Sequence, residues 1–338
     1  MKMKEFKNFI GVDSSKSTLD LALITEDNEL IELKLKNDES IILKTLKQVF
    51  KDHNLPATGT LICAEYTGHF GNKLINTALR LQLNIWIESA FNILHSQGLK
   101  RGKNDQVDAL RIAEYAKRFS DKCLLYTPQA KSVELLERLD SERDLVVKDI
   151  AKYKLQLKQE DGFFDSKYFK EKERRLQKII NFNEKILREL DERITEIIKE
   201  DESLNNNYQN IITIEGIGPK TAVATIIATG NFTRFTNPRK FACHAGCAPF
   251  RYDSGTSIRS RNRVSHRANK NLKRTYHMAA LSTITMKGEL RQYYDRKVEE
   301  GKNKMSVINA LRSKLIHRVF AVVKQNRKYD KNYTHSLG

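Results

Sequence analysis

Short apolar runs and helical patterns alternate through the first 125 residues of the chain. Apolar stretches at 9–12 and 19–23 flank a polar turn of small residues, which predicts two strands joined as a hairpin. Asp13 then lies at the carboxyl end of a buried strand, where an isolated carboxylate is costly unless it is paired or binds a metal. Further patterns predict strands at 30–35, 60–65 and 85–87, and helices at 41–50, around 74–79, and from Asn104 or Asp105 onward.

This order of elements predicts the fold class. Three strands in series, followed by helix, strand, helix, strand and helix, is the order of a ribonuclease H-like α/β fold, a mixed sheet with helices on its faces. Glu65 would then end the strand that lies beside the first one. We therefore expect an amino-terminal α/β domain over residues 1–126.

Residues 127–205 show a different periodicity. Apolar side chains recur at alternating three- and four-residue spacings in two stretches, which are interrupted near 162–165. This pattern predicts two long helices with coiled-coil seams, which either form an antiparallel hairpin or pair with another subunit. The seam residues are Leu139, Val146, Ile150, Tyr153 and Leu157 in the first stretch and Leu176, Ile179, Asn183, Leu187, Leu190, Ile194 and Ile197 in the second.

The last segment, residues 206–338, is predicted to be a mainly helical domain. Gly216 and Gly218 lie between two apolar helical runs, so the backbone N–H groups of this turn and the positive end of the second helix would suit a phosphate. The arrangement resembles a helix-hairpin-helix element that binds the DNA backbone, with Lys220 as an added cation. A Gly-x-Gly sequence also suits a plain tight turn, so both interpretations stay open.

Composition limits the class of protein. The chain has 338 residues, 30% of them charged, and no apolar run approaches the ~20 residues that cross a bilayer. The four scattered cysteines fit a reducing compartment, so we expect a cytoplasmic protein without membrane contacts. Cys243, His244 and Cys247 suggest a zinc site, but no second ligand pair follows at finger spacing, and the small residues around them favour a packed interior.

The net charge of +18 is concentrated in one segment. Between Phe232 and Arg274, eleven Lys or Arg side chains stand against one acid, Asp253. Such a block is typical of a protein that binds a polyanion, and nucleic acid is the expected partner, although a solvated basic face would carry the same sign. The expected nucleic-acid contacts are Arg251, Arg259, Arg261, Arg263, Arg267, Lys270, Lys273 and Arg274, together with Gly216, Gly218 and Lys220.

Four acids are candidate metal ligands. Asp13 and Glu65 end neighbouring predicted strands, and Asp105 and Asp108 share one face at the start of a helix. Hard oxygen ligands on rigid elements suit Mg²⁺, and two ions about 3.5–4 Å apart need several carboxylates. An acid at a helix start is also a common N-cap, so the hypothesis depends on the convergence of all four.

Ser254 is a candidate nucleophile. It precedes a glycine at the start of the most basic stretch of the chain. Its hydroxyl could attack phosphorus, but a Ser-Gly pair is usually only a turn. The residue alone therefore does not distinguish a nucleophile from a turn residue.

Several short motifs follow one another in a characteristic order. They are Gly11-Val12-Asp13, Glu65 before Thr67-Gly68, Lys103-Asn104-Asp105-Gln106-Val107-Asp108, Glu215-Gly216-Ile217-Gly218, and Ala245-Gly246 before Ser254-Gly255. Together they resemble the DEDD transposases of bacterial insertion sequences, to which the Piv-type DNA invertases are related. The resemblance covers nearly the whole chain. One departure is visible, because the family often has Lys-x-Gly-Asn after the serine and this chain has His266-Arg267-Ala268-Asn269.

The resemblance implies a role for each part. The family has an amino-terminal domain similar to the Holliday-junction resolvase RuvC, here 1–126, a coiled coil, here 127–205, and a carboxy-terminal transposase domain, here 206–338. It implies that Asp13, Glu65, Asp105 and Asp108 bind Mg²⁺, as two ions, and that Ser254 forms a covalent phosphoserine intermediate. Related members use an element-encoded bridge RNA that pairs with donor and target DNA. Exchange between two duplexes further implies a homo-oligomer, a dimer or tetramer.

Other functions compete with this one. A RuvC-like metal-dependent structure-specific endonuclease would use water as the nucleophile, and Ser254 would be only a turn. A non-catalytic DNA- or RNA-binding scaffold would use its acids structurally. A sugar-kinase-like ATPase shares the first hairpin, but no convincing nucleotide-binding loop follows in the chain. A covalent protein–DNA adduct distinguishes the transposase from the nuclease.

Overall fold

The computed structural model describes residues 5–96, 105–159, 166–248 and 268–330, with short stretches at 253–254, 258–259 and 264. The chain divides into two compact units, Met1–Pro128 and Gln129–Gly338, which we call unit 1 and unit 2. Among the helices in these described ranges, none combines the length and the apolar character needed to cross a membrane.

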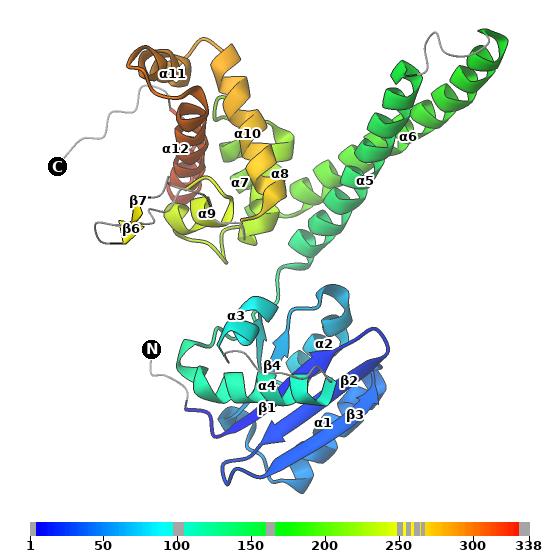
Figure 1. Ribbon diagram of the computed structural model, residues 1–338, viewed down its shortest axis with the longest axis vertical. Helices are drawn as coiled ribbons and strands as arrows, with labels where there is room; N and C mark the ends of the chain where they lie inside the picture. Colours follow the sequence, from blue (N-terminus) through cyan, green and yellow to red (C-terminus); the bar gives the residue numbers. More distant parts are fainter. Residues whose placement is uncertain are drawn as a thin grey trace. The chain divides into compact units, whose positions relative to one another are not determined.

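A five-stranded mixed sheet forms the centre of unit 1 (Figure 1). Its strand order is β3-β2-β1-β4-β5, with β1 antiparallel to β2 and parallel to β4. Three consecutive antiparallel strands, followed by parallel strands reached through helices, form the ribonuclease H-like arrangement that the sequence predicted. The strands are β1 (Asn8–Ser14), β2 (Thr18–Ile24), β3 (Leu30–Lys36), β4 (Thr60–Glu65) and β5 (Asn84–Glu88).

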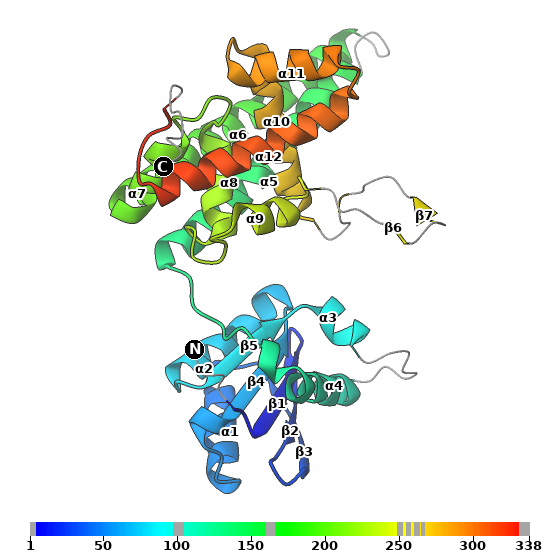
Figure 2. The same ribbon diagram turned by 90° about the vertical axis from the view of Figure 1, so that its left-hand side faces the viewer.

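Helices cover both faces of this sheet, as Figure 2 shows. Ile10 and Val12 pack with the helices α1 and α2, whereas Phe9 packs with α4 on the opposite face, because successive strand residues point to opposite sides. The helices are α1 (Glu39–Asp52), α2 (Asn72–Arg80), the short α3 (Ala90–His95), which the sequence did not predict, and α4 (Asp105–Arg118). Single 3₁₀ turns lie at η1 (Ala57–Gly59), η2 (Gly68–Gly71) and η3 (Ser120–Lys122).

Unit 2 begins with two long helices, α5 (Lys131–Gln159) and α6 (Ser166–Glu200), which pack along each other (Figure 1). Arg143 pairs with Asp191 at 2.6 Å and Lys154 with Glu184 at 2.7 Å, so the two helices run antiparallel within one chain. The hairpin alternative is therefore present in this structure. One seam position was wrong: Ile179 is 39% exposed, and its neighbour, Ile180, is 1% exposed and occupies the seam.

The remainder of unit 2 is a helical domain around one core. The base of the hairpin contributes Val133, Leu136 and Ile194 to this core, where Phe241 and Tyr276 are the largest fully buried side chains. The helices are α7 (Glu202–Ile211), α8 (Pro219–Thr229), α9 (Pro238–His244), α10 (Lys270–Thr285), α11 (Glu289–Glu299) and α12 (Lys304–Lys324), with the two-residue strands β6 (Asp253–Ser254) and β7 (Ile258–Arg259).

Candidate catalytic and nucleic-acid-binding sites

Asp13 and Glu65 lie side by side at the carboxyl ends of two parallel strands. The register pairs Val12 of β1 with Ala64 of β4, so the next residue on each strand is one of these two acids. Glu65 points to the same face as Cys63, two residues earlier, and Cys63 packs with Ile112 of α4. Neighbouring residues of paired strands share a face, so both carboxylates are on the α4 side of the sheet. Both side chains are half-buried.

A glycine allows α4 to approach this edge of the sheet. A Cβ atom at Gly11 would lie 2.2 Å from the Ala109 carbonyl oxygen and 2.3 Å from the Ala113 backbone nitrogen. Farther along α4, Ala116 packs with Phe9 at the start of β1, so α4 runs antiparallel to β1. The first turn of α4, which contains Asp105 and Asp108, therefore lies toward Asp13 at the end of β1.

Asp108 has a cationic partner on its own helix. Arg111 Nη1 donates to Asp108 Oδ1 at 2.8 Å, and the Asp108 side chain is 29% exposed. Asp105 begins the helix, and its side chain lies outside the described part of the structure. The sharing of one face of α4 by the two acids, expected from their spacing of three residues, stays a prediction.

Three rigid elements of unit 1 carry candidate metal ligands. Carboxylates from β1, β4 and α4 are hard oxygen donors on three rigid elements, which is what Mg²⁺ takes. Among the side chains that the structure describes, no three His, Cys, Asp or Glu residues are gathered closely enough to hold a metal ion. The set of Asp13, Glu65, Asp105 and Asp108 stays a prediction.

Sequence reasoning missed a fifth acid at this edge. Glu88 ends β5 and is the register partner of Glu65. Its carboxylate accepts hydrogen bonds from the Ser89 backbone N–H at 2.7 Å, from Asn92 Nδ2 at 2.9 Å and from Tyr115 Oη at 3.3 Å. Burial, with Glu88 adding to it, raises the pKa of Tyr115 to about 12. Glu88 therefore fastens α3 and α4 to the sheet, and only its place at a strand end could have indicated it.

Ser254 belongs to unit 2, whereas the acids belong to unit 1. It ends β6 and pairs with Ile258 of β7 in an antiparallel ladder. The described backbone thus places Ser254 at the last position of β6. Its side chain lies outside the described part, so its role as nucleophile stays a prediction.

The turn between α7 and α8 is docked on α10 through one of its glycines. Gly216 has φ +85°, and a Cβ there would lie 2.2 Å from Thr283 Cγ2 and 2.9 Å from the Ala279 carbonyl oxygen. Gly218 is the N-cap of α8, is exposed, and has no atom within 4 Å of a Cβ position. The open side of Gly218, at a helix N-terminus, is where a backbone phosphate could approach.

Lys220 has two carboxylate partners. Its Nζ lies 2.5 Å from Asp140 Oδ1 and 2.8 Å from Asp144 Oδ1, both on α5. No local sequence pattern indicates this pairing, because the partners are about 80 positions away. In this structure the Lys220 charge joins α8 to α5, and its contact with nucleic acid stays a prediction.

Part of the basic segment is described. Lys270, Lys273 and Arg274 are exposed in the first turns of α10, whose first turn contains no acid. Cations are unfavourable at a helix N-terminus, so their gathering there is better explained by a polyanion than by helix stability. Arg259 is described only by its backbone in β7, and Arg251, Arg261, Arg263 and Arg267 lie outside the described residues.

Packing accounts for the Cys-His cluster. Cys247 and Ala245 are buried in the unit 2 core, and the His244 ring lies 5.0 Å from the Phe235 ring. Burial raises the pKa of the Cys247 thiol to about 11 and lowers the pKa of His244. Both shifts favour neutral side chains in a packed interior.

Comparisons with known proteins identify two family profiles that match this chain. Residues 10–160 match a family profile described as DEDD transposase of the IS110 type, and residues 208–295 match one described as "Transposase IS116/IS110/IS902 family". The "Pilin gene-inverting protein" of Moraxella lacunata is 27% identical over 96% of this chain and 98% of its own length. A protein of insertion element IS110 from Streptomyces coelicolor is 28% identical over 36% of this chain and 29% of its own length.

Among solved structures, "T. thermophilus RuvC in complex with Holliday junction substrate" is similar over 36% of this chain and 99% of that chain. The sequence identity is 11% and the TM-score is 0.29. The strand order and register of unit 1 by themselves identify its ribonuclease H-like arrangement.

Proposed function

We propose that this chain, which belongs to the IS116/IS110/IS902 family of transposases, cuts and exchanges DNA strands at the ends of an insertion sequence. The observation that carries the proposal is the pairing of Asp13 and Glu65 on neighbouring strands, facing the first turn of α4. A relative named for inverting a pilin gene supports strand exchange on DNA.

Asp13, Glu65, Asp105 and Asp108 would hold Mg²⁺, as two ions. The metal would stabilise the negative charge that develops on the phosphodiester as it is attacked. The chain's own contribution is to place hard oxygen donors on rigid elements, with Gly11 setting how closely α4 approaches. Lys270, Lys273 and Arg274 would hold the DNA backbone through their charges.

Ser254 is the proposed nucleophile. Its Oγ forms a bond to phosphorus while the bond from phosphorus to the 3′ oxygen breaks, and the hydroxyl proton passes to that 3′ oxygen. The phosphodiester energy is thereby stored as a phosphoserine ester. Attack by a 3′ hydroxyl of another strand reverses the step, joins new strands and restores the serine. Hydrolysis would lose that bond, which is why exchange without an external energy source favours a serine.

Donor and target DNA are the proposed substrates, paired by an element-encoded bridge RNA. Two duplexes must be cut together, so a dimer or tetramer of this chain is part of the proposal. Leu155 and Phe182, on the outer surface of the α5–α6 hairpin, are 55% and 64% exposed and support contacts between copies there.

The experiment that tests the proposal looks for a covalent adduct. The protein is incubated with labelled DNA carrying the element ends, the flanking transcribed RNA and Mg²⁺, and is then denatured. A slowly migrating labelled band is expected for the wild type and for Ser257→Ala, the matched control, and none for Ser254→Ala.

The alternative is a RuvC-like metal-dependent endonuclease that uses water. It predicts cleavage without an adduct, because water leaves no bond to the protein. Cleavage by Ser254→Ala at the wild-type rate would therefore replace the transposase proposal with the nuclease.

A further inference from the structure

Helix α12 carries positive charge without any acid. Its 21 residues contain five Lys or Arg side chains and no Asp or Glu. Exposed surfaces usually mix both signs of charge, so cations without acids on the exposed side of α12 favour an anionic partner. None of these residues belongs to the basic segment described above.

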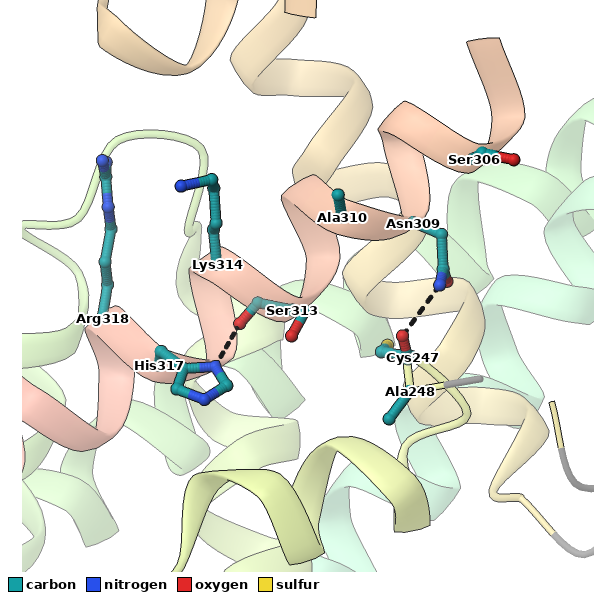
Figure 3. A pocket seen from close by; sticks show the side chains of 9 residues that line it. All are labelled: Cys247, Ala248, Ser306, Asn309, Ala310, Ser313, Lys314, His317 and Arg318. Atoms are coloured by element: carbon teal, nitrogen blue, oxygen red, sulfur yellow. Dashed lines mark hydrogen bonds between the residues drawn. The ribbon is translucent and has the colours of Figure 1, made fainter. Parts of the chain in front are cut away.

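A pocket of about 680 Å³ lies between this helix and the chain that follows α9 (Figure 3). One wall is formed by Cys247 and Ala248, and the other by residues of α12 at helical spacing, among them Ser306, Ala310 and Ser313. Its volume is in the range of pockets that enclose a small ligand, about 300–1,000 Å³. These small side chains leave the space open, and the hydroxyl groups of Ser306 and Ser313 can donate hydrogen bonds.

The cations at the pocket differ in their partners. Arg318 is paired with Glu289 of α11. The Lys314 ammonium lies 4.6 Å from the centre of the Tyr293 ring and makes no ion pair with a carboxylate in the described part of the chain. Lys314 is therefore the cation that can neutralise an anion in the pocket.

Two polar side chains are held in fixed orientations at the pocket, as the dashed lines in Figure 3 show. Asn309 Nδ2 donates to the Cys247 carbonyl oxygen at 2.8 Å, which fastens one wall to the other. His317 Nδ1 donates to the Ser313 carbonyl oxygen at 2.8 Å, so its Nε2 is the nitrogen left for a ligand. A built pocket with few adjustable groups binds its ligand at lower entropic cost.

A buried arginine adds positive potential behind these groups. Arg312 is 5% exposed, and its guanidinium contacts His277 Nδ1 and, at 3.5 Å, Asn309 Oδ1. Its Nε has no hydrogen-bond partner, and no carboxylate in the described ranges pairs with it. A buried cation without a counter-ion is costly, and an anion in the adjoining pocket would offset that cost.

We propose that this pocket binds the sugar–phosphate backbone of a single-stranded nucleic acid, with Lys314 neutralising a phosphate and the Ser306 and Ser313 hydroxyls donating to it. A concave pocket can enclose a nucleotide of one strand, whereas a duplex presents its backbone to protruding surfaces. The proposal rests on the proposed function and adds a strand contact outside the basic segment.

The test compares Lys314→Gln with Lys178→Gln, which removes an exposed lysine of α6 far along the same unit. Binding of a short labelled single-stranded DNA, and of the RNA of the same sequence, is measured at several salt concentrations. Each lost phosphate contact makes the negative slope of log K against log salt less steep by about 0.7, which corresponds to about a fivefold loss of affinity at about 0.1 M salt. We expect that change for Lys314→Gln and none for Lys178→Gln.

A second variant, Ala310→Phe, fills the pocket without changing the charge. It should weaken binding at least as much as Lys314→Gln, while its thermal unfolding shows that unit 2 is still folded. A loss for only one oligonucleotide identifies that nucleic acid as the ligand, and a loss for both supports recognition of the shared backbone.

The outcomes separate this proposal from the one on which it rests. If the wild type binds both strands with a steep salt dependence, and Lys314→Gln and Ala310→Phe do the same, the pocket proposal is overturned and the proposed function is untouched. If the wild type binds neither strand and cuts no DNA, the proposed function fails, and the pocket proposal fails with it.

Discussion

The two units of this chain would present opposite charges to a phosphodiester. Unit 1 gathers carboxylates at the ends of β1 and β4, where a phosphate would be repelled unless a metal lies between them. Unit 2 presents α10 and α12, two helices that contain no acid, and therefore already has the charge that a phosphate needs. Cutting should depend on divalent metal, whereas binding should not. Cleavage would thus belong to unit 1 and nucleic-acid binding to unit 2, and a substitution in one unit should leave the property of the other unchanged.

The largest effect should come from Glu65→Gln, which removes a charge from unit 1 without changing its shape. We expect the cleavage rate to fall by at least about 100-fold, because removing a residue that only orients a metal ligand already lowers activity by up to about 100-fold. Glu88→Gln is the matched control, because Glu88 is the register partner of Glu65 and its hydrogen bonds hold α3 and α4. The measurement is cleavage of element-end DNA in Mg²⁺. Equal loss in both variants would mean that this edge is structural.

The second effect concerns the close approach of α4. A Cβ at Gly11 would overlap the backbone of Ala109 and Ala113, so Gly11→Ala should displace α4 and destabilise unit 1 by about 1–3 kcal/mol. Gly71→Ala is the control, because its Cβ would meet only Thr67 Oγ1, at an ordinary 3.7 Å, and it should change stability by less than about 0.5 kcal/mol. Denaturant unfolding measures both. Nucleic-acid binding by unit 2 should persist in Gly11→Ala, and its loss would show that the two units do not divide the work.

The smallest effect lies in unit 2 and depends on pH. Burial, and then Arg312, lower the pKa of His277 below 6.5, so the folded state binds fewer protons than the unfolded state in acid. The contribution of His277 to the free energy of unfolding is fully present above pH 6.5, and it is lost as the pH falls from there through the lowered pKa. We expect the thermal midpoint to fall on mild acidification, and less so in His277→Gln, which can still accept from Arg312. An identical pH dependence in both proteins would assign the effect to other groups, His244 among them.

Local patterns predicted most of unit 1, because strand alternation fixes which face each residue takes. The adjacency of Asp13 and Glu65 followed from strand order alone. Glu88 was missed because a glutamate after an apolar run looks the same whether it binds metal or fastens a helix. Long-range partners, such as those of Lys220, leave no local signal in the sequence.

Two features of unit 2 show other limits. Ile179 and Ile180 are adjacent, and a repeat of 3.5 residues drifts against a helix of 3.6 residues per turn, so the seam moved by one position. The pocket on α12 was not predicted, because small polar residues at helical spacing are also typical of a solvated face. Only the opposite wall, formed by Cys247 and Ala248, distinguishes the pocket from a solvated helix face.

The ion pairs of Lys220 connect the α5–α6 hairpin to the turn before α8. With 29 residues at about 1.5 Å each, α5 is a rod about 43 Å long. Asp140 and Asp144, in the first half of α5, pair with Lys220 in the first turn of α8, whose N-cap is Gly218. If a second copy of the chain contacts the far end of this rod, as proposed above, a displacement there would reach the Gly216–Gly218 turn through the two ion pairs of Lys220.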